Sequence, residues 1–261
     1  MEKYLEFAKE TARGAGEITR KYFYGENGAG YKYDQTIVTK ADTEINSYLI
    51  ERVREFFPTH AVDGEEEQFG ASEYVWVCDP VDGTAMYARH IPVSVFSLAL
   101  VKDGKPIVGV IYDSFTNNMY WASLGNGAYL NGKKIIVNAL PFSGMRTIVN
   151  LDMWPDAEYN LWEVYRELGK KTYLVGLGSI IRAAACVSSG DFTAAIYPGT
   201  KHKNCDIAAV KIIVEEAGGK VTDLFGREQR YDGDIEGALI SNGKVHEEAL
   251  EIIKQHIIIN K

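Results

Sequence analysis

The spacing of apolar residues predicts two amphipathic helices at the start of the chain. In the first, apolar residues recur every three or four positions between Tyr4 and Tyr22, which places them on one helical face. The second opens where Thr39 and Asp42 resemble a capping box, and it ends before Pro58. Both helices carry a buried stripe, so we expect them to pack together.

From about residue 74 the pattern changes to short runs rich in Val, Ile, Tyr and Phe, separated by Gly, Asn and Asp turns. The runs up to residue 137 predict a meandering, largely antiparallel sheet. After about residue 145, strand-like runs alternate with helical stretches, which is typical of a layered α/β arrangement. The helical stretches of this part are predicted to begin at Pro155, Ser179, Asp206 and Lys244.

Neither a repeat nor a flexible linker interrupts the chain. We therefore interpret residues 1–144 and 145–261 as two architectures within one tightly packed unit. The first is an α+β half with two helices and the antiparallel sheet, and the second is an α/β half.

Composition disfavours several classes of protein. The formal net charge of −8 is the wrong sign for a sequence-independent nucleic-acid binder. Charged residues are mixed into the N-terminal helix, and no apolar segment is long enough for a membrane span. The cysteines Cys78, Cys186 and Cys205 are odd in number and lie in apolar surroundings, which favours reduced thiols and a cytoplasmic location.

The segment Asp-Pro-Val-Asp-Gly-Thr carries the strongest chemical signal, because an apolar strand runs straight into it. Asp79 and Asp82 lie three residues apart across a bend, so both carboxylates can converge on hard divalent cations, and Val81 can offer its carbonyl. Gly83 lets the backbone approach a ligand, and the amides of Gly83 and Thr84 at a helix start would bind a phosphate oxygen.

The alternative interpretation of this segment is an ordinary surface turn, because Asp-Pro and Asp-Gly are common turn sequences. Two further carboxylate sources argue against it. Glu65 belongs to an acidic stretch one strand earlier, and Asp206 opens a predicted helix much later in the chain. Three separate sources predict one assembled site for divalent cations.

Together these motifs resemble, in order, those of the inositol monophosphatase family, and the resemblance covers nearly the whole chain. The matching segments are Val-Thr-x-x-Asp at 38–42, Gly-Glu-Glu at 64–66, Asp-Pro-x-Asp-Gly-Thr at 79–84, Gly-Ser at 178–179, and Asp206 with the ending Glu-Ala-Gly-Gly-x-x-x-Asp at 216–223. The resemblance implies an α/β (α+β) fold, a layered αβαβα sandwich of the sugar-phosphatase type. It also implies a lithium-sensitive, Mg²⁺-dependent phosphatase that forms a homodimer.

Carried over residue by residue, the resemblance implies two metal sites. Glu65, Asp79 and the Val81 carbonyl would hold one Mg²⁺, and Asp79, Asp82 and Asp206 would hold a second. Glu65 would also hold a third, looser ion. A pair of ions that spans the phosphate fits in-line displacement by an activated water.

The resemblance names Asp42, Glu65 and Thr84 as catalytic, with Thr84 and Asp42 orienting and deprotonating the attacking water. Asp42 has an alternative role, because an acidic residue in the first turn of a helix interacts favourably with the helix dipole. Four histidines, His60, His90, His246 and His256, are scattered along the chain and are expected at the surface.

The substrate is less well specified. Asp82, Gly83, Thr84, Gly178 and Ser179 are the implied contacts. Two positions depart from the family pattern, Met86 and Cys205. Cations that would neutralise a second phosphate are Arg182, Lys201 and Lys203, although lysines in a polar loop are commonly just solvated.

These residues indicate a phosphomonoesterase that acts on a small phosphorylated metabolite, inositol monophosphate and/or fructose 1,6-bisphosphate. The sequence leaves open nucleoside 3′,5′-bisphosphate and histidinol phosphate as substrates. It also leaves open a non-catalytic regulatory binding protein on the same fold.

Overall fold

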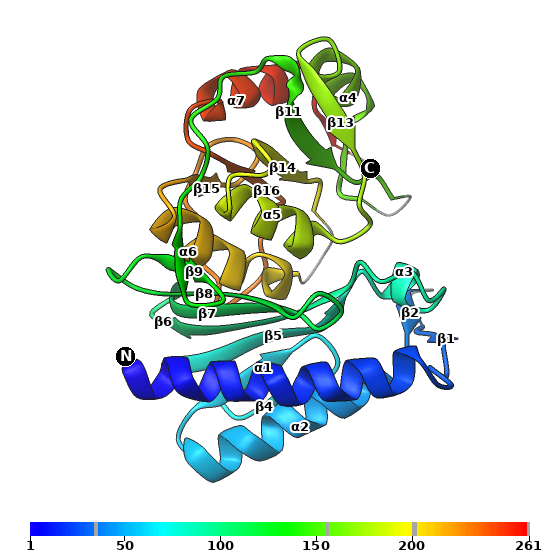
Figure 1. Cartoon of the computed structure of the whole chain (residues 1–261), viewed down its shortest axis with the longest axis vertical. Coiled ribbons are helices and arrows are strands. Elements are labelled where there is room, and N and C mark those ends of the chain that lie inside the picture. Colours follow the sequence, from blue (N-terminus) through cyan, green and yellow to red (C-terminus); the bar gives the residue numbers. More distant parts are fainter. Residues whose placement is uncertain (34–35, 155–156, 200–202, 260–261) are drawn as a thin grey trace.

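A computed structural model describes residues 1–33, 36–154, 157–199 and 203–259. Its elements stack in five layers, helix, sheet, helix, sheet, helix (Figure 1). The outer helices at the bottom are α1 (Glu2–Phe23) and α2 (Lys40–Phe56). The predicted αβαβα sandwich is confirmed.

The first sheet has eight strands in the order β10-β9-β8-β7-β6-β5-β3-β4. All neighbours are antiparallel except β3 and β5, which run parallel. Its strands are β3 (Ala61–Gly64), β4 (Gln68–Phe69), β5 (Tyr74–Asp82), β6 (Val95–Lys102), β7 (Lys105–Asp113), β8 (Asn118–Ser123), β9 (Ala128–Leu130) and β10 (Lys133–Ile135).

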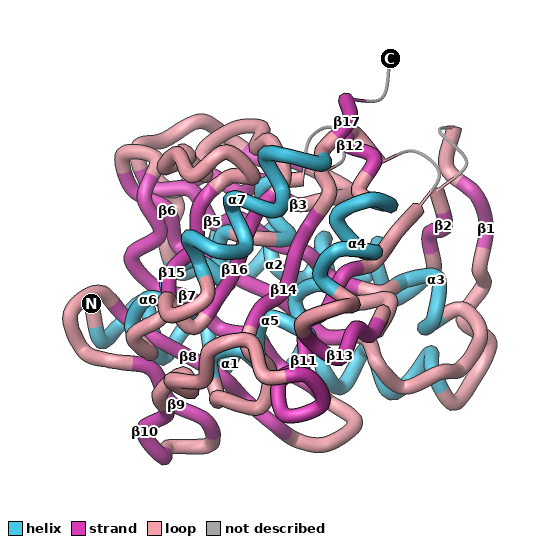
Figure 2. Tube along the Cα trace, turned by 90° about the horizontal axis from the view of Figure 1, so that it is seen from above, coloured by secondary structure: helices cyan, strands magenta, loops and turns pink. Residues whose placement is uncertain are grey.

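The second sheet is mixed and has five strands in the order β13-β11-β14-β16-β15. They are β11 (Gly144–Leu151), β13 (Thr172–Val175), β14 (Ala194–Tyr197), β15 (Lys220–Thr222) and β16 (Ala238–Ser241). Helices α5 (Ile180–Ser188) and α6 (Ala208–Glu216) lie between the sheets, and α4 (Trp162–Leu168) and α7 (His246–His256) cover the far face (Figures 1 and 2).

The remaining elements are short. They are α3 (Thr84–Tyr87), the 3₁₀ turn η1 (Asn204–Asp206), the hairpin of β1 (Gly30–Tyr31) and β2 (Ile37–Val38), and the pair of β12 (Tyr159–Asn160) and β17 (Ile258–Ile259). The helix predicted from Asp206 starts instead with η1 before α6. The helix start predicted at Pro155 lies outside the described residues, and α4 begins at Trp162.

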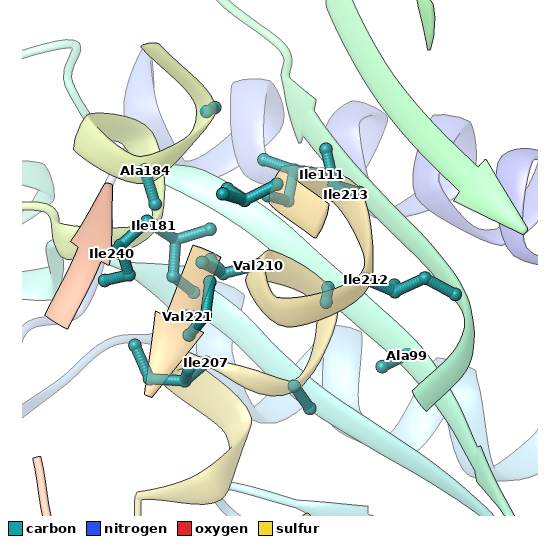
Figure 3. Packing of buried hydrophobic residues seen from close by; sticks show 14 of the residues in the cluster. Ala99, Ile111, Ile181, Ala184, Ile207, Val210, Ile212, Ile213, Val221 and Ile240 are labelled. Carbon is teal, nitrogen blue, oxygen red and sulfur yellow. The ribbon is translucent and has the colours of Figure 1, made fainter. Parts of the chain in front are cut away.

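Side-chain alternation along β5 explains why its sequence is continuously apolar. Trp76 and Cys78 pack with α1 and α2, whereas Val77 between them faces the central helices. A strand that is buried on both faces has no solvated side to mark with polar residues. The core on the central side joins both halves of the chain, with Ile111 of β7 near Ile213 of α6 (Figure 3).

Each of the three cysteines is a free thiol. Across the described ranges, none of the helices has both the length and the apolar character that crossing a bilayer requires.

The prediction that the histidines lie at the surface is wrong for His60 and His246, which are both buried. His246 is fully buried at the start of α7, where Nε2 lies 3.0 Å from Thr222 Oγ1 and Nδ1 lies 2.8 Å from Ser241 Oγ. The hydroxyls belong to β15 and β16, which the fold brings next to α7. A buried imidazole needs such hydrogen-bond partners, and here only the tertiary structure supplies them.

We expect His246 to make the fold acid-sensitive. Burial lowers its pKa from 6.5 to about 4, so the folded state favours the neutral ring. The resulting stabilisation is complete above pH 6.5 and is lost as the pH falls from there towards 4, by at most about 3 kcal/mol. Chemical denaturation of wild type and His246→Gln across this range should show a shallower pH dependence in the variant. His256→Gln, on the same helix, should follow wild type; equal slopes in all three proteins would contradict the prediction.

Candidate active site

A β-bulge in β5 positions the first two acidic residues. Asp79 pairs with Ser97 and Asp82 pairs with Val95, so three steps on β5 match two steps on β6. The strand therefore runs through the motif, where the sequence had suggested a bend at its end. An extra residue in a strand re-aims the side chains beside it. Asp79 Oδ1 also accepts a 2.9 Å hydrogen bond from the Val81 amide, which fixes the local conformation.

Asp82 is held from the central helix layer. Its Oδ2 accepts hydrogen bonds from Ser179 Oγ at 2.5 Å and from the Ile181 amide at 2.8 Å. Ser179 caps α5 and also accepts from the Arg182 amide at 3.2 Å. A carboxylate at the N-terminus of a helix is stabilised by free amides and by the helix dipole. Ser179 therefore orients Asp82 in this structure.

Asp206 ends η1 and completes the group. The side chains of Asp79 and Tyr197 lie close enough to its carboxyl group to affect its pKa. Asp79, Asp82 and Asp206 are only 2%, 8% and 7% exposed. Segments that are more than a hundred residues apart in sequence thus bring three carboxyl groups into one buried place.

The carboxyl groups raise one another's pKa values. Burial is the largest cause for Asp79, whose pKa lies well above its usual range, and the charges of Glu65, Asp82 and Asp206 add to it. Burial and the charge of Asp206 raise the pKa of Asp82 to about 7. Buried carboxylates in this arrangement are costly unless cations neutralise them. Hard oxygen ligands are the donors that Mg²⁺ prefers, so the residues fit such an ion.

Glu65 lies near the three aspartates, but its side chain forms ion pairs with two lysines. Lys203 Nζ lies 2.5 Å and Lys32 Nζ 3.1 Å from its Oε1. Burial raises the pKa of Glu65, but the charges of Lys203 and Lys32 outweigh that effect and lower it. Over the part of the chain that the structure describes, no three acidic, His or Cys side chains are arranged to hold an ion as they stand.

Asp42 and Thr84 come together as the sequence predicts. Thr84 Oγ1 lies 2.8 Å from the Val81 carbonyl and 3.4 Å from Asp42 Oδ1. Asp42 Oδ2 accepts from the Thr39 amide at 2.8 Å and from its hydroxyl at 2.5 Å, which is the predicted helix cap. Burial raises the pKa of Asp42 to about 7, against the opposing effect of these bonds. The Asp42 carboxylate thus caps the start of α2 through one oxygen and contacts Thr84 through the other.

Gly83, just after β5, lies very close to the backbone of Gly178, in the loop before α5. A Cβ at this position would lie 2.8 Å from the Gly178 carbonyl oxygen, and its φ is +85°. Gly178 has φ +73°, and a Cβ there would lie 2.8 Å from Met86 Cε. Only glycine meets both demands, an unusual backbone conformation and a close backbone contact. Met86 therefore packs against the Gly178 loop.

Two of the three cations predicted for a second phosphate have carboxylate partners in the structure. Arg182 Nη1 forms an ion pair with the buried Asp113, and Lys203 contacts Glu65. Lys201 lies outside the described residues. Sequence analysis missed Lys32 and Tyr197 as neighbours of the carboxylates. Nothing in the sequence marked them, because Lys32 lies in the β1–β2 hairpin and Tyr197 ends β14, and neither residue belongs to one of the acidic motifs.

The αβαβα sandwich and the buried carboxylates at the β5 bulge agree with what the motifs imply, a phosphatase for small phosphate esters. The sequence pattern of the inositol monophosphatase family matches residues 1–258. The chain belongs to this family of phosphatases.

Individual relatives agree with this assignment. The chain is 31% identical to the fructose-1,6-bisphosphatase/inositol-1-monophosphatase of Aquifex aeolicus over 268 residues, which cover 98% of this chain and 97% of the relative. It is 30% identical to the putative Nus factor SuhB of Neisseria meningitidis over 98% of this chain and all of that protein. An IMPase structure from Thermotoga maritima superimposes with a TM-score of 0.86 at 28% identity, over 98% of each chain.

Gly83→Ala should damage both stability and activity. The left-handed backbone costs an alanine about 1 kcal/mol, and the contact with the Gly178 carbonyl adds to that cost. Gly132→Ala is the matched control, because its φ is +81° and no described atom lies within 4 Å of the added Cβ. Thermal unfolding should show a clearly larger loss for Gly83→Ala. Equal losses would mean that the close contact is unimportant.

Ser179→Ala should impair catalysis more than folding. The change removes one hydrogen bond to Asp82 and a helix cap worth about 1 kcal/mol. If Asp82 holds a metal ion, loss of the group that orients it should reduce activity or metal affinity roughly 10–100-fold. Ser179→Thr retains the hydroxyl and should recover most of the loss in kcat. If Ser179→Ala keeps wild-type kcat and Mg²⁺ affinity, Ser179 only caps α5.

Proposed function

We propose that this protein is a Mg²⁺-dependent phosphomonoesterase for a small phosphorylated metabolite, with inositol monophosphate and fructose 1,6-bisphosphate as its leading substrates. The observation that carries the proposal is the burial of Asp79, Asp82 and Asp206 together. Such a group of anions is stable only with cations or protons, and family membership supplies the reaction class. The name of the Aquifex aeolicus relative supports both substrates.

Two or three Mg²⁺ ions are proposed, held by Glu65, Asp79, Asp82, Asp206 and the Val81 carbonyl. Bound Mg²⁺ supplies an activated water and charge stabilisation for the phosphate. No protein nucleophile is needed in this scheme, so the chain's own task is to hold its ligands and the substrate.

The side chains and backbone of the protein would orient the attacking water, position Asp82 and contact the substrate. Thr84 and Asp42 would orient the attacking water and take its proton, since the pKa of Asp42 near 7 suits a general base at neutral pH. Ser179 and the start of α5 hold Asp82 in place. Gly83, Thr84 and the Gly178 loop would lie along the phosphate, with Arg182, Lys201 and Lys203 as candidate partners for a second one.

The resemblance further supports lithium inhibition and a homodimer. The three free thiols favour a reducing compartment, which we propose is the cytoplasm. Exposed apolar side chains on the second half, among them Met145 and Trp162, are candidates for burial between subunits.

A non-catalytic regulatory role is the second candidate. It is favoured by the relative named as a putative Nus factor. A non-catalytic binding protein would release no phosphate, whereas an enzyme should lose phosphate release when a metal ligand is substituted. Measuring phosphate release in wild type and in such a variant therefore separates the two hypotheses.

Asp82→Asn should abolish most phosphate release. The amide keeps the size of the side chain but removes a metal-binding charge, so we expect a loss of at least about 100-fold. The assay measures Mg²⁺-dependent phosphate release from a generic ester. Asp191→Asn, an exposed position away from the site, should behave as wild type. An inactive wild type would favour the regulatory role, and full activity in Asp82→Asn would overturn the assignment of Asp82 as a metal ligand.

A substrate panel should identify the organic half of the substrate. Inositol 1-phosphate, fructose 1,6-bisphosphate, nucleoside 3′,5′-bisphosphate and histidinol phosphate would be compared at saturating Mg²⁺. If Lys201 and Lys203 serve a second phosphate, their double alanine variant should lose kcat/KM on bisphosphates by roughly tenfold or more, and less on monophosphates. An equal loss on every substrate would remove these lysines from substrate selection.

A further inference from the structure

Two ammonium groups share one oxygen of Glu65. Lys203 Nζ lies 2.5 Å and Lys32 Nζ 3.1 Å from Oε1, and Lys32 also lies 2.5 Å from Glu66 Oε1. The two lysines come from different places, the loop before η1 and the β1–β2 hairpin. All three side chains are largely shielded from solvent, with 13–25% of each side chain exposed.

Lys203 also faces the rest of the carboxylate group. Asp206 and Asp79 both act electrostatically on its ammonium, after Glu65. The lysine is therefore a monovalent cation among the side chains assigned to divalent ions. Its contact with Glu65 competes with a Glu65–Mg²⁺ contact, because the ammonium charge at Oε1 repels a divalent ion that approaches the same carboxylate.

We infer that Lys203, assisted by Lys32, neutralises Glu65 in the metal-free protein and must give up that contact when Mg²⁺ binds. This inference rests on the proposed function, because it takes Glu65 as a metal ligand. The lysines then have two opposing effects. They stabilise the fold without metal, and they weaken the affinity of the site for Mg²⁺.

The size of the effect follows from linkage. A ligand that must displace an existing contact binds more weakly by the free energy of that contact. Couplings between neighbouring sites commonly change an affinity by about 5- to 150-fold, so we expect roughly tenfold for Lys203. Lys32 also has Glu66 as a partner and lies farther from Oε1, so its effect should be smaller.

The test is calorimetric titration of chelator-treated protein with Mg²⁺ alone, without substrate. Lys203→Met keeps the apolar stem and removes the charge, and it should tighten the Mg²⁺ Kd roughly tenfold. Lys32→Met should tighten it by a smaller factor. Lys171→Met is the matched control, because Lys171 pairs with Glu248 at 2.8 Å on the surface, and its Kd should equal that of wild type.

Thermal unfolding gives an independent measurement. In chelator, Lys203→Met should unfold at a lower temperature than wild type, and saturating Mg²⁺ should narrow or close that difference. If Lys203→Met does not fold without metal, Lys32→Met still tests the idea, because its hairpin position is outside the core. The same titration on that variant then decides the outcome.

An unchanged or weaker Mg²⁺ Kd in both variants would overturn the inference and leave the lysines as permanent structural partners of Glu65. A wild type that binds no Mg²⁺ would overturn the proposed metal site as well. A wild type that binds Mg²⁺, with variants that bind no tighter, overturns only the role of the lysines. The two failures are therefore distinguishable.

Discussion

The repulsion among buried carboxylates is the constraint on which the rest of this structure depends. Asp79, Asp82 and Asp206 are nearly inaccessible to solvent, and burial with neighbouring negative charge raises the pKa of each. A fold tolerates such a group only when rigid partners hold each oxygen and cations compensate the charge. The bulge in β5 and the cap of α5 supply the rigid partners.

The layered architecture explains how the fold supports this group. Strand β5 is buried on both faces, so its backbone has packed neighbours above and below and cannot easily relax around the charged residues. The contact of Gly83 with the Gly178 carbonyl brings the first sheet directly against the loop before α5. A site shared by two such elements is held more precisely than one on a single loop.

Charge compensation at Glu65 differs from that at the three aspartates. Lysines reach Glu65 from the β1–β2 hairpin and from the loop before η1, whereas burial and neighbouring negative charge raise the pKa values of Asp79 and Asp206. Glu65 therefore has protein cations as partners, and the aspartates at the centre of the site lack comparable ion pairs among the described residues. A divalent ion bound by these carboxylates would link metal affinity to stability.

The sequence by itself predicted the helices and sheets of both halves and the acidic motifs, because apolar periodicity and short local motifs are properties of neighbouring residues. The five-layer sandwich followed from the resemblance to the family. The same resemblance also predicted the meeting of Asp42 and Thr84. Tertiary structure alone decided that β5 continues as a bulge, that Lys32 and Lys203 meet at Glu65, and that His246 is buried between hydroxyls. These features depend on contacts between segments far apart in the chain, and such contacts leave no local pattern in the sequence.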